Sequence, residues 1–131
     1  MYSKYNSRKC KCGQGHLHDS KKEAQRCNEL TFLEKAGEIT NLRQQVKYTL
    51  IPTQKEFTSG LITKGKNKGQ PKTGKTLEKE CSYYADFDYY TADGIHVVED
   101  VKGYKGSTAY AVFKIKKKLM LYFHNIQVRE I

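Results

Sequence analysis

The feature that most constrains this chain is a pair of strand-like segments joined by a very short turn. Residues 83–90 are rich in aromatic side chains, and residues 95–102 alternate between apolar and polar positions, as is typical of β-strands. The intervening Thr91-Ala92-Asp93-Gly94 is a turn sequence, and Gly94 suits the positive-φ position of a three-residue hairpin loop. The sequence therefore predicts an antiparallel hairpin whose register is determined by the turn.

The predicted register brings acidic residues together on one face of the hairpin. A loop over residues 92–94 places Asp86 directly opposite Asp100. Lys102 shares this face because alternate residues of a strand point to the same side, and Asp88 is a further acidic candidate on it. Opposed carboxylates repel each other unless a cation such as Mg²⁺ lies between them. We therefore predict a Mg²⁺ (or Mn²⁺) site at Asp86 and Asp100 with Lys102 beside it, the alternative being solvated carboxylates paired with nearby lysines.

The remaining segments predict the elements around this hairpin. Ser20 and Glu23 have the spacing of a capping box, so we expect a helix to begin there and to end near Gly37. The other expected elements are a strand over residues 45–51, a helix over 108–123 and a closing strand over 126–131. The inward positions expected for this second helix are Ala109, Val112, Phe113, Leu119 or Met120, and Phe123. This order of elements indicates an α/β fold with a mixed β-sheet core flanked by helices.

The length of 131 residues allows one ordinary domain. We divide the chain into a polar N-terminal segment over residues 1–18 and a domain over residues 19–131, which contains a basic loop over residues 53–79. No stretch approaches the roughly 20 apolar residues of a membrane helix, and the polar N-terminus does not resemble a signal peptide. We therefore expect a cytoplasmic protein without a membrane partner.

The charge of the chain favours a polyanionic partner. It has 24 Lys and Arg against 14 Asp and Glu, a formal net charge of +10, and nucleic acid is the commonest polyanion of a cytoplasm. The lysines expected to contact DNA phosphates lie on one face of the second helix and in the basic loop: Lys114, Lys117 and Lys118, together with Lys72 and Lys75. The alternative is that these lysines are solvated and serve only solubility.

One segment of the basic loop matches a nucleotide-binding pattern. Residues 69–76 have the spacing of the phosphate-binding loop of nucleotide hydrolases. That loop requires a buried strand before it and a helix beginning at its lysine, whereas here lysine-rich sequence precedes it and a tyrosine-rich strand follows. We therefore do not predict nucleotide hydrolysis.

Cysteines and histidines gather near the N-terminus. Cys10, Cys12, His18 and Cys27 supply four soft ligands of the kind that tetrahedral zinc prefers, and His16 is an alternative to His18. Zinc at these residues would have a structural role, because it would fasten the N-terminal segment to the first helix. The alternative is a loose tail, with Cys27 buried in the core as a small apolar residue.

The acidic hairpin resembles the motif of the PD-(D/E)XK, or restriction-endonuclease-like, nuclease superfamily. Asp86 is followed after a short hairpin by Asp100-Val101-Lys102, and Ala85 stands where proline is usual in that motif. The resemblance is closest to small members encoded by bacteriophages, which share the runs Asp-Ser-Lys-Lys-Glu-Ala at 19–24 and Glu-Asp-Val-Lys-Gly at 99–103. It implies a restriction-endonuclease-like fold and Mg²⁺-dependent hydrolysis of phosphodiester bonds in DNA.

The resemblance also implies roles for particular residues. Asp86 and Asp100 would be the metal ligands, Lys102 the catalytic lysine and Glu23 an accessory acid, although the capping box explains Glu23 without chemistry. Glu99 would point to the opposite face of a regular strand, so we leave it out of the site.

The small size of the chain bears on the kind of substrate. A short chain without a separate specificity domain favours structure-directed cleavage of branched or junction DNA, as in Holliday junction resolvases, in the cytoplasm of a bacterial host. Such cleavage usually requires a homodimer, which the sequence does not show. The alternatives are a non-catalytic nucleic-acid-binding module stabilised by zinc, and a protein-binding domain that retains a nuclease fold.

Overall fold

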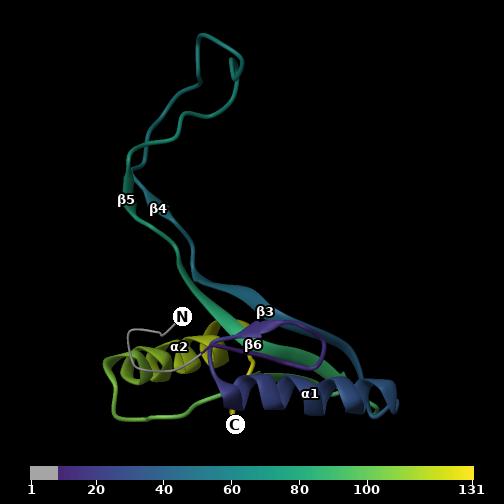
Figure 1. Cartoon of the computed structure of the whole chain (residues 1–131). Coiled ribbons are helices and arrows are strands. Elements are labelled where there is room, and N and C mark those ends of the chain that lie inside the picture. The colour runs from purple at the N-terminus through teal and green to yellow at the C-terminus, as the bar shows by residue number, and fades with distance from the viewer. Residues whose placement is uncertain (1–8) are drawn as a thin grey trace. The chain divides into compact units, whose positions relative to one another are not determined.

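In the computed structural model, which describes residues 9–131, short strands at the N-terminus precede two helices and a sheet (Figure 1). The elements are β1 (Cys10–Lys11), β2 (Leu17–His18), α1 (Lys21–Lys35), β3 (Ile39–Ile51), β4 (Gln54–Lys55), β5 (Thr76–Glu78), β6 (Cys81–Thr91), β7 (His96–Asp100), α2 (Thr108–His124) and β8 (Arg129–Glu130). The chain divides into two units, one over residues up to 48 and from 84 onwards, the other over residues 49–83. Neither described helix has the length and apolar character of a membrane span.

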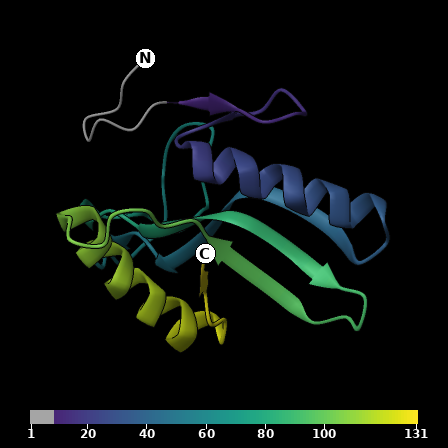
Figure 2. The ribbon, with the colours of Figure 1, turned by 60° about the horizontal axis from the view of Figure 1, so that its bottom comes forward.

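A four-stranded sheet with the order β3-β6-β7-β8 forms the centre of the first unit. β6 and β7 are antiparallel, whereas β7 and β8 are parallel, so the sheet is mixed. The two helices α1 and α2 lie on opposite faces of this sheet (Figure 2). The predicted α/β arrangement of a mixed sheet flanked by helices is therefore confirmed.

α1 begins and ends where the sequence predicts. The Ser20 side chain caps it by accepting a hydrogen bond from the backbone N–H of Glu23 at 3.1 Å, and Gly37 follows its end with φ of 81°. The buried residues of α1 form one core cluster with residues of β6 and β7: Ala24, Cys27 and Leu30 with Phe87, Tyr89 and Val97. This cluster fixes α1 against one face of the sheet.

The predicted register of the hairpin is confirmed. Gly94 has φ of 83° and donates a backbone hydrogen bond to Thr91, which itself pairs with Ile95 through a bond of 2.9 Å. Phe87 lies opposite Glu99 in β7. One further step along the same register sets the neighbouring Asp86 and Asp100 against each other.

Two expectations about the elements were wrong. β3 begins at Ile39 rather than at residue 45, because Asn41 and Gln45 have φ of 56° and 50° and interrupt the alternation that marks a strand in the sequence. In α2, Phe113 and Met120 are buried as expected, but Val112 and Phe123 are exposed by 46% and 50%. The helix therefore contacts the sheet along a narrower line than its apolar residues suggest.

The second unit contains local antiparallel pairing within the basic loop. β4 pairs with β5, and an isolated bridge joins Leu61 to Pro71. Phe57, in the same loop, is 94% exposed. Thr76 begins a strand, whereas a nucleotide-binding loop requires a helix at this point.

Candidate functional site

An open cavity of about 650 Å³ lies beside the N-terminus of α1 and the end of β7. All four residues predicted to act in catalysis line it: Glu23, Asp86, Asp100 and Lys102. Glu23 comes from α1, Asp86 from β6, and the other two from the end of β7 and the residues just after it. The fold thus gathers side chains that are far apart in the sequence at one cavity.

Amide donors hold the carboxylate of Asp86. Its Oδ2 accepts a hydrogen bond from the backbone N–H of Val101 at 2.9 Å, and its Oδ1 accepts one from Nε2 of Gln45 at 3.2 Å. The same Gln45 nitrogen lies 3.3 Å from Oε1 of Glu23 and donates to it as well. Gln45 therefore links two of the acidic residues, and sequence reasoning missed it because a glutamine in a strand gives no signal of such a role.

The N-terminus of α1 is anchored next to the cavity. Nζ of Lys22 donates hydrogen bonds to the backbone carbonyl of Lys102 at 2.7 Å and to that of Ile131 at 2.9 Å. These bonds connect α1 to the chain that leaves β7 and to the C-terminal residue. They fix the helix so that the buried Glu23, in its first turn, faces the cavity.

Lys102 is held by two neighbours of different kinds. Its Nζ lies 3.2 Å from Oδ2 of Asp100 and 3.9 Å from the centre of the Phe113 ring. The ring of an aromatic residue attracts a cation over its face, and the Lys102 side chain is only 23% exposed. Phe113, predicted only as a core residue of the second helix, therefore also positions the amine at the acidic site.

The acidic residues of the cavity repel one another electrostatically. Burial, together with the adjacent Asp100 and then Glu23, raises the pKa of Asp86 from its ordinary value of 3.8 to about 8. A carboxylate in this position is costly to ionise while no cation is near it. The arrangement is therefore suited to a divalent cation, whose charge would offset the repulsion.

Two further acids next to the hairpin have structural partners instead. Asp88 is fully buried and accepts hydrogen bonds from Arg43, His96 and Tyr48, so it lies in a closed polar group rather than at the cavity. Glu99 points to the opposite face, where it pairs with Arg26 of α1. Asp88 was a further candidate from the sequence, and its three donors correct that interpretation.

The lysines expected to contact DNA have different surroundings. Nζ of Lys117 donates to Oε2 of Glu130 at 2.8 Å, so this lysine is half-buried and engaged within the protein. Lys114 and Lys118 of α2 are exposed. The two lysines of the basic loop, Lys72 and Lys75, are also exposed, and they belong to the second unit.

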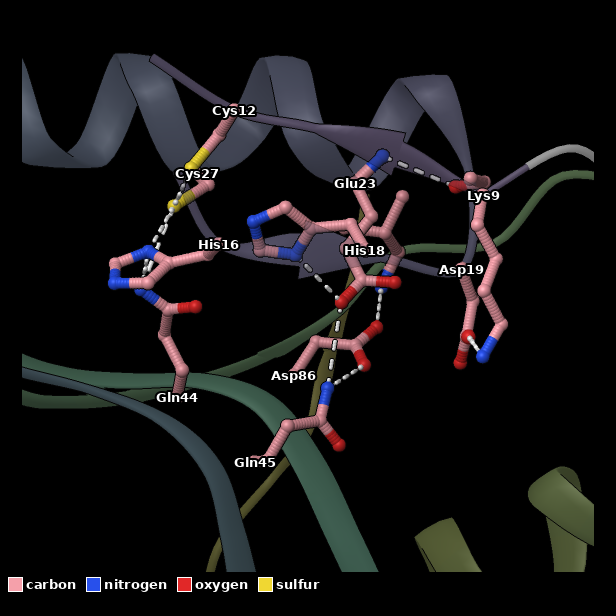
Figure 3. Close-up of polar contacts among 12 residues, drawn as sticks. Lys9, Cys12, His16, His18, Asp19, Glu23, Cys27, Gln44, Gln45 and Asp86 are labelled. Carbon is pink, nitrogen blue, oxygen red and sulfur yellow. Dashed lines mark hydrogen bonds and ion pairs between the residues drawn. The ribbon is translucent and has the colours of Figure 1, made fainter. Parts of the chain in front are cut away.

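A second candidate site lies between the N-terminal strands β1 and β2 and helix α1. Two cysteines and two histidines converge there, with their ligand atoms all within 4.8 Å of one another: Cys12, His16, His18 and Cys27 (Figure 3). The Sγ atoms of Cys12 and Cys27 are 3.6 Å apart, and Sγ of Cys27 lies 3.7 Å from Nδ1 of His16. This cluster could bind a metal ion such as zinc.

The composition of this cluster corrects the predicted ligand set. Cys10 was included in that set, but it lines a separate cavity beside α1, and His16 occupies the fourth position. The reason is the turn after β1, in which the backbone N–H of Cys12 bonds to the carbonyl of His16 at 3.0 Å and Gly15 has φ of 85°. This tight turn brings Cys12 and His16 together and leaves Cys10 on the preceding strand.

The two thiols of the cluster differ in acidity. Burial opposes ionisation of Cys12, but the His18 side chain and nearby backbone groups outweigh burial and lower the pKa of this thiol to about 6. Burial and the neighbouring Cys12 raise the pKa of Cys27 to about 11. The pair therefore holds one thiolate readily, and a bound cation would favour the second.

His18 lies between the two centres. Its Nδ1 is 3.1 Å from Oε1 of Glu23, and both side chains are more than nine-tenths buried. Its other ring nitrogen, Nε2, is buried and has no hydrogen-bond partner within the described part of the chain. A buried ring nitrogen without a partner at a cluster of thiols is what a metal ligand looks like before the ion binds.

The chain as a whole matches one family model over nearly its full length. No curated protein and no solved structure matches it. The matching model is described as "Protein of unknown function (DUF1064)", and the match covers residues 2–131. The chain that carries these two centres therefore belongs to the DUF1064 family.

Proposed function

We propose that this protein is a Mg²⁺-dependent DNA endonuclease of the PD-(D/E)XK, restriction-endonuclease-like type. The observation that supports this most directly is the convergence of Asp86, Asp100 and Lys102 on one open cavity. Each of these residues stands at its position in the superfamily motif that the sequence resembles. The mixed sheet between two helices is compatible with the fold expected for that superfamily.

The residues at the cavity fit a divalent cation. Asp86 and Asp100 offer carboxylate oxygens, and Mg²⁺ commonly binds through one or two carboxylates and keeps water in its remaining positions. Glu23 adds a third acid at the same cavity. When bound, Mg²⁺ would supply Lewis acidity toward the phosphate and the attacking water.

The protein's own side chains would orient the reacting groups. Lys102, fixed between Asp100 and the Phe113 ring, would donate a hydrogen bond from Nζ to the attacking water or to the phosphate. Glu23 would add a carboxylate beside the cation, and the hydrogen bond from Gln45 would keep this carboxylate in a fixed orientation. Lys22 would keep the helix that carries Glu23 in place.

Branched or junction DNA is the substrate that we propose. The net charge of +10 favours binding to phosphates, and Lys114 and Lys118 offer exposed amines on α2. Contacts of these lysines with phosphates would follow the shape of the DNA, because phosphate contacts carry no base sequence by themselves. Cleavage at a branch would be favoured by a homodimer.

A cleavage assay tests this proposal with Lys102→Met, which removes the amine and keeps an unbranched apolar side chain against Phe113. We expect the natural protein to cut a four-way junction in the presence of Mg²⁺. We expect Lys102→Met to lower the rate by on the order of 100-fold or more, because it removes a preorganised donor. The measurement is the single-turnover rate on junction and linear duplex of equal base composition, with and without Mg²⁺ or Mn²⁺.

Lys35→Met is the matched control for that variant. Lys35 is exposed at the end of α1, so the same substitution there should leave the rate unchanged. Binding of DNA without cleavage in either metal would instead support a non-catalytic nucleic-acid-binding module. In that case the acidic cavity would have no catalytic role.

We also propose that the cluster of Cys12, His16, His18 and Cys27 binds a structural zinc ion. Two thiols and two imidazoles form a common tetrahedral zinc set. The ligands come from the N-terminal hairpin of β1 and β2 and from α1, so zinc would fasten these two elements together. The buried Nε2 of His18 supports this assignment because the ion would give it a partner.

Metal content distinguishes the cluster from the ligand set expected from the sequence. We expect about one zinc per chain in the natural protein and in Cys10→Ala, and less than half of that in Cys12→Ala, since a four-ligand site tolerates the loss of a ligand poorly. The measurement is elemental analysis of the purified protein after dialysis. Equal zinc loss in both variants would contradict the assignment of His16 in place of Cys10.

A further inference from the structure

One carboxylate is shared by the two centres. Oε1 of Glu23 lies 3.1 Å from Nδ1 of His18 on the side of the Cys/His cluster. The same oxygen lies 3.3 Å from Nε2 of Gln45, which is itself 3.2 Å from Oδ1 of Asp86 (Figure 3). A continuous chain of polar contacts therefore runs from the cluster to the acidic cavity.

The chemistry of imidazole gives this chain of contacts a direction. An imidazole that binds a metal through one nitrogen keeps its hydrogen on the other, and that N–H usually donates to a carboxylate or a carbonyl. Zinc on Nε2 of His18 would therefore leave Nδ1 as the donor and Glu23 as its acceptor. Without zinc this nitrogen makes no hydrogen bond in the described chain and has only the Cys12 side chain near it, so the ring is held less firmly on the side of the cluster.

We infer that zinc at the Cys/His cluster orients Glu23 through His18, and thereby prepares the cavity of Asp86 and Asp100 to bind its divalent cation. This inference rests on the proposed nuclease function and assigns it a second, distant requirement. His18 is a positioning residue, since it reaches the cavity only through Glu23. Zinc would then support catalysis itself, in addition to holding the N-terminal hairpin on α1.

The two histidines of the cluster provide a matched pair of variants. His16→Cys and His18→Cys both leave three cysteines and one histidine, which is also a common zinc set. Only the second removes the donor to Glu23, because His16 contacts Cys27 and Gln44 instead. The comparison therefore holds zinc binding constant and changes the link to the cavity alone.

We expect both variants to fold and to keep zinc, and only His18→Cys to weaken the acidic site. Loss of a residue that orients a metal site typically costs about 10–100-fold in metal affinity or activity. His18→Cys should therefore bind Mn²⁺ at the cavity, measured by electron paramagnetic resonance, about 10-fold or more weakly than His16→Cys does. The cleavage rate at low Mg²⁺ should fall by a similar factor and recover in part at high Mg²⁺.

A double-variant cycle with Glu23→Gln provides a second measurement that does not depend on His18→Cys alone. Glu23→Gln removes a carboxylate from the cavity and leaves every zinc ligand in place. It should therefore weaken Mn²⁺ binding without loss of zinc. Once Glu23 is gone, His18→Cys should weaken Mn²⁺ binding no further, because coupled residues give non-additive effects. A merely structural role of His18 would give effects that add.

The outcomes separate this inference from the function on which it rests. Equal Mn²⁺ affinity in His16→Cys and His18→Cys, with zinc present in both, would overturn the inference even if the natural protein cuts DNA. Additive effects of His18→Cys and Glu23→Gln in the cycle would overturn it as well. Mn²⁺ binding by Glu23→Gln as tight as in the natural protein would overturn it without recourse to His18→Cys. Absence of cleavage by the natural protein would overturn the nuclease proposal, while the Mn²⁺ comparison would still test the link between the centres.

Discussion

Asp86→Asn is expected to stabilise the Mg²⁺-free protein and at the same time to abolish its cleavage of DNA. Asparagine keeps the shape of the side chain and removes the charge that Asp100 and Glu23 oppose. It also removes a carboxylate ligand of the cation, and the several kcal/mol that a catalytic metal contributes correspond to a loss of rate on the order of 1,000-fold. A gain in stability with a loss of activity marks a residue that serves function at the expense of the fold.

The pH dependence of stability gives this prediction a sign. The pKa of Asp86 is raised to about 8 in the folded protein from an ordinary value of 3.8, so between these values the folded protein retains a proton that the unfolded chain has released. Stability therefore falls as the pH rises through this range. Asp86→Asn lacks this loss, and at pH 8 it should be more stable than the natural protein by at least about 1.4 kcal/mol, the equivalent of one pKa unit. Urea unfolding of zinc-loaded protein at pH 5 and pH 8, without Mg²⁺, measures the difference.

The same substitution two residues further along β6 should act in the opposite direction. Burial opposes ionisation of Asp88, but hydrogen bonds from Tyr48, His96 and Arg43 outweigh it and lower the pKa of this carboxyl. Asp88→Asn weakens those charge-assisted bonds, so it should destabilise the protein at neutral pH, and the cost should shrink in acid. If both variants lose stability at pH 8, Asp86 is not under the repulsion that its neighbours imply.

The acidic pair could be predicted because its geometry is local. A turn of three residues determines how two adjoining strands pair, so the positions of Asp86 and Asp100 follow from counting along the chain. The start of α1 is local in the same way, since Ser20 and Glu23 belong to one turn of helix. Patterns of this kind need no knowledge of distant segments.

The residues that join the two centres could not be predicted, since their roles arise from packing between distant segments. Gln45 reaches Glu23 and Asp86 from a position with φ of 50°, which interrupts the alternation of β3 and conceals which way the side chain points. His16 enters the cluster because the turn at Gly15 reverses the chain. The sequence alone does not show which of the nearby cysteines and histidines would be ligands. Only the folded arrangement shows that His18 contacts Glu23.

Arg26→Leu is expected to cause a large loss of stability. Nε and Nη2 of Arg26 donate to the two carboxylate oxygens of Glu99 at 2.9 and 2.7 Å, and Glu99 is fully buried. Removal of one partner leaves a buried charge without its counter-charge, which typically costs about 3–5 kcal/mol. Tyr89 still donates to Glu99 in the variant, but a phenol supplies no positive charge. Urea unfolding at pH 7 measures the loss.

Two controls decide whether that loss comes from the buried charge. Glu29→Gln removes the other partner of Arg26. The Glu29 side chain is half exposed, and a surface ion pair contributes only about 0–1 kcal/mol. The double variant Arg26→Leu/Glu99→Leu removes both charges and should recover much of the stability, as replacement of a whole buried ion pair by apolar residues often does. Equal losses from Arg26→Leu and Glu29→Gln would contradict this account. Glu99 precedes Asp100 on β7, and neighbouring residues of a strand point to opposite faces. The ion pair that holds Glu99 toward α1 therefore also keeps Asp100 directed at the acidic cavity.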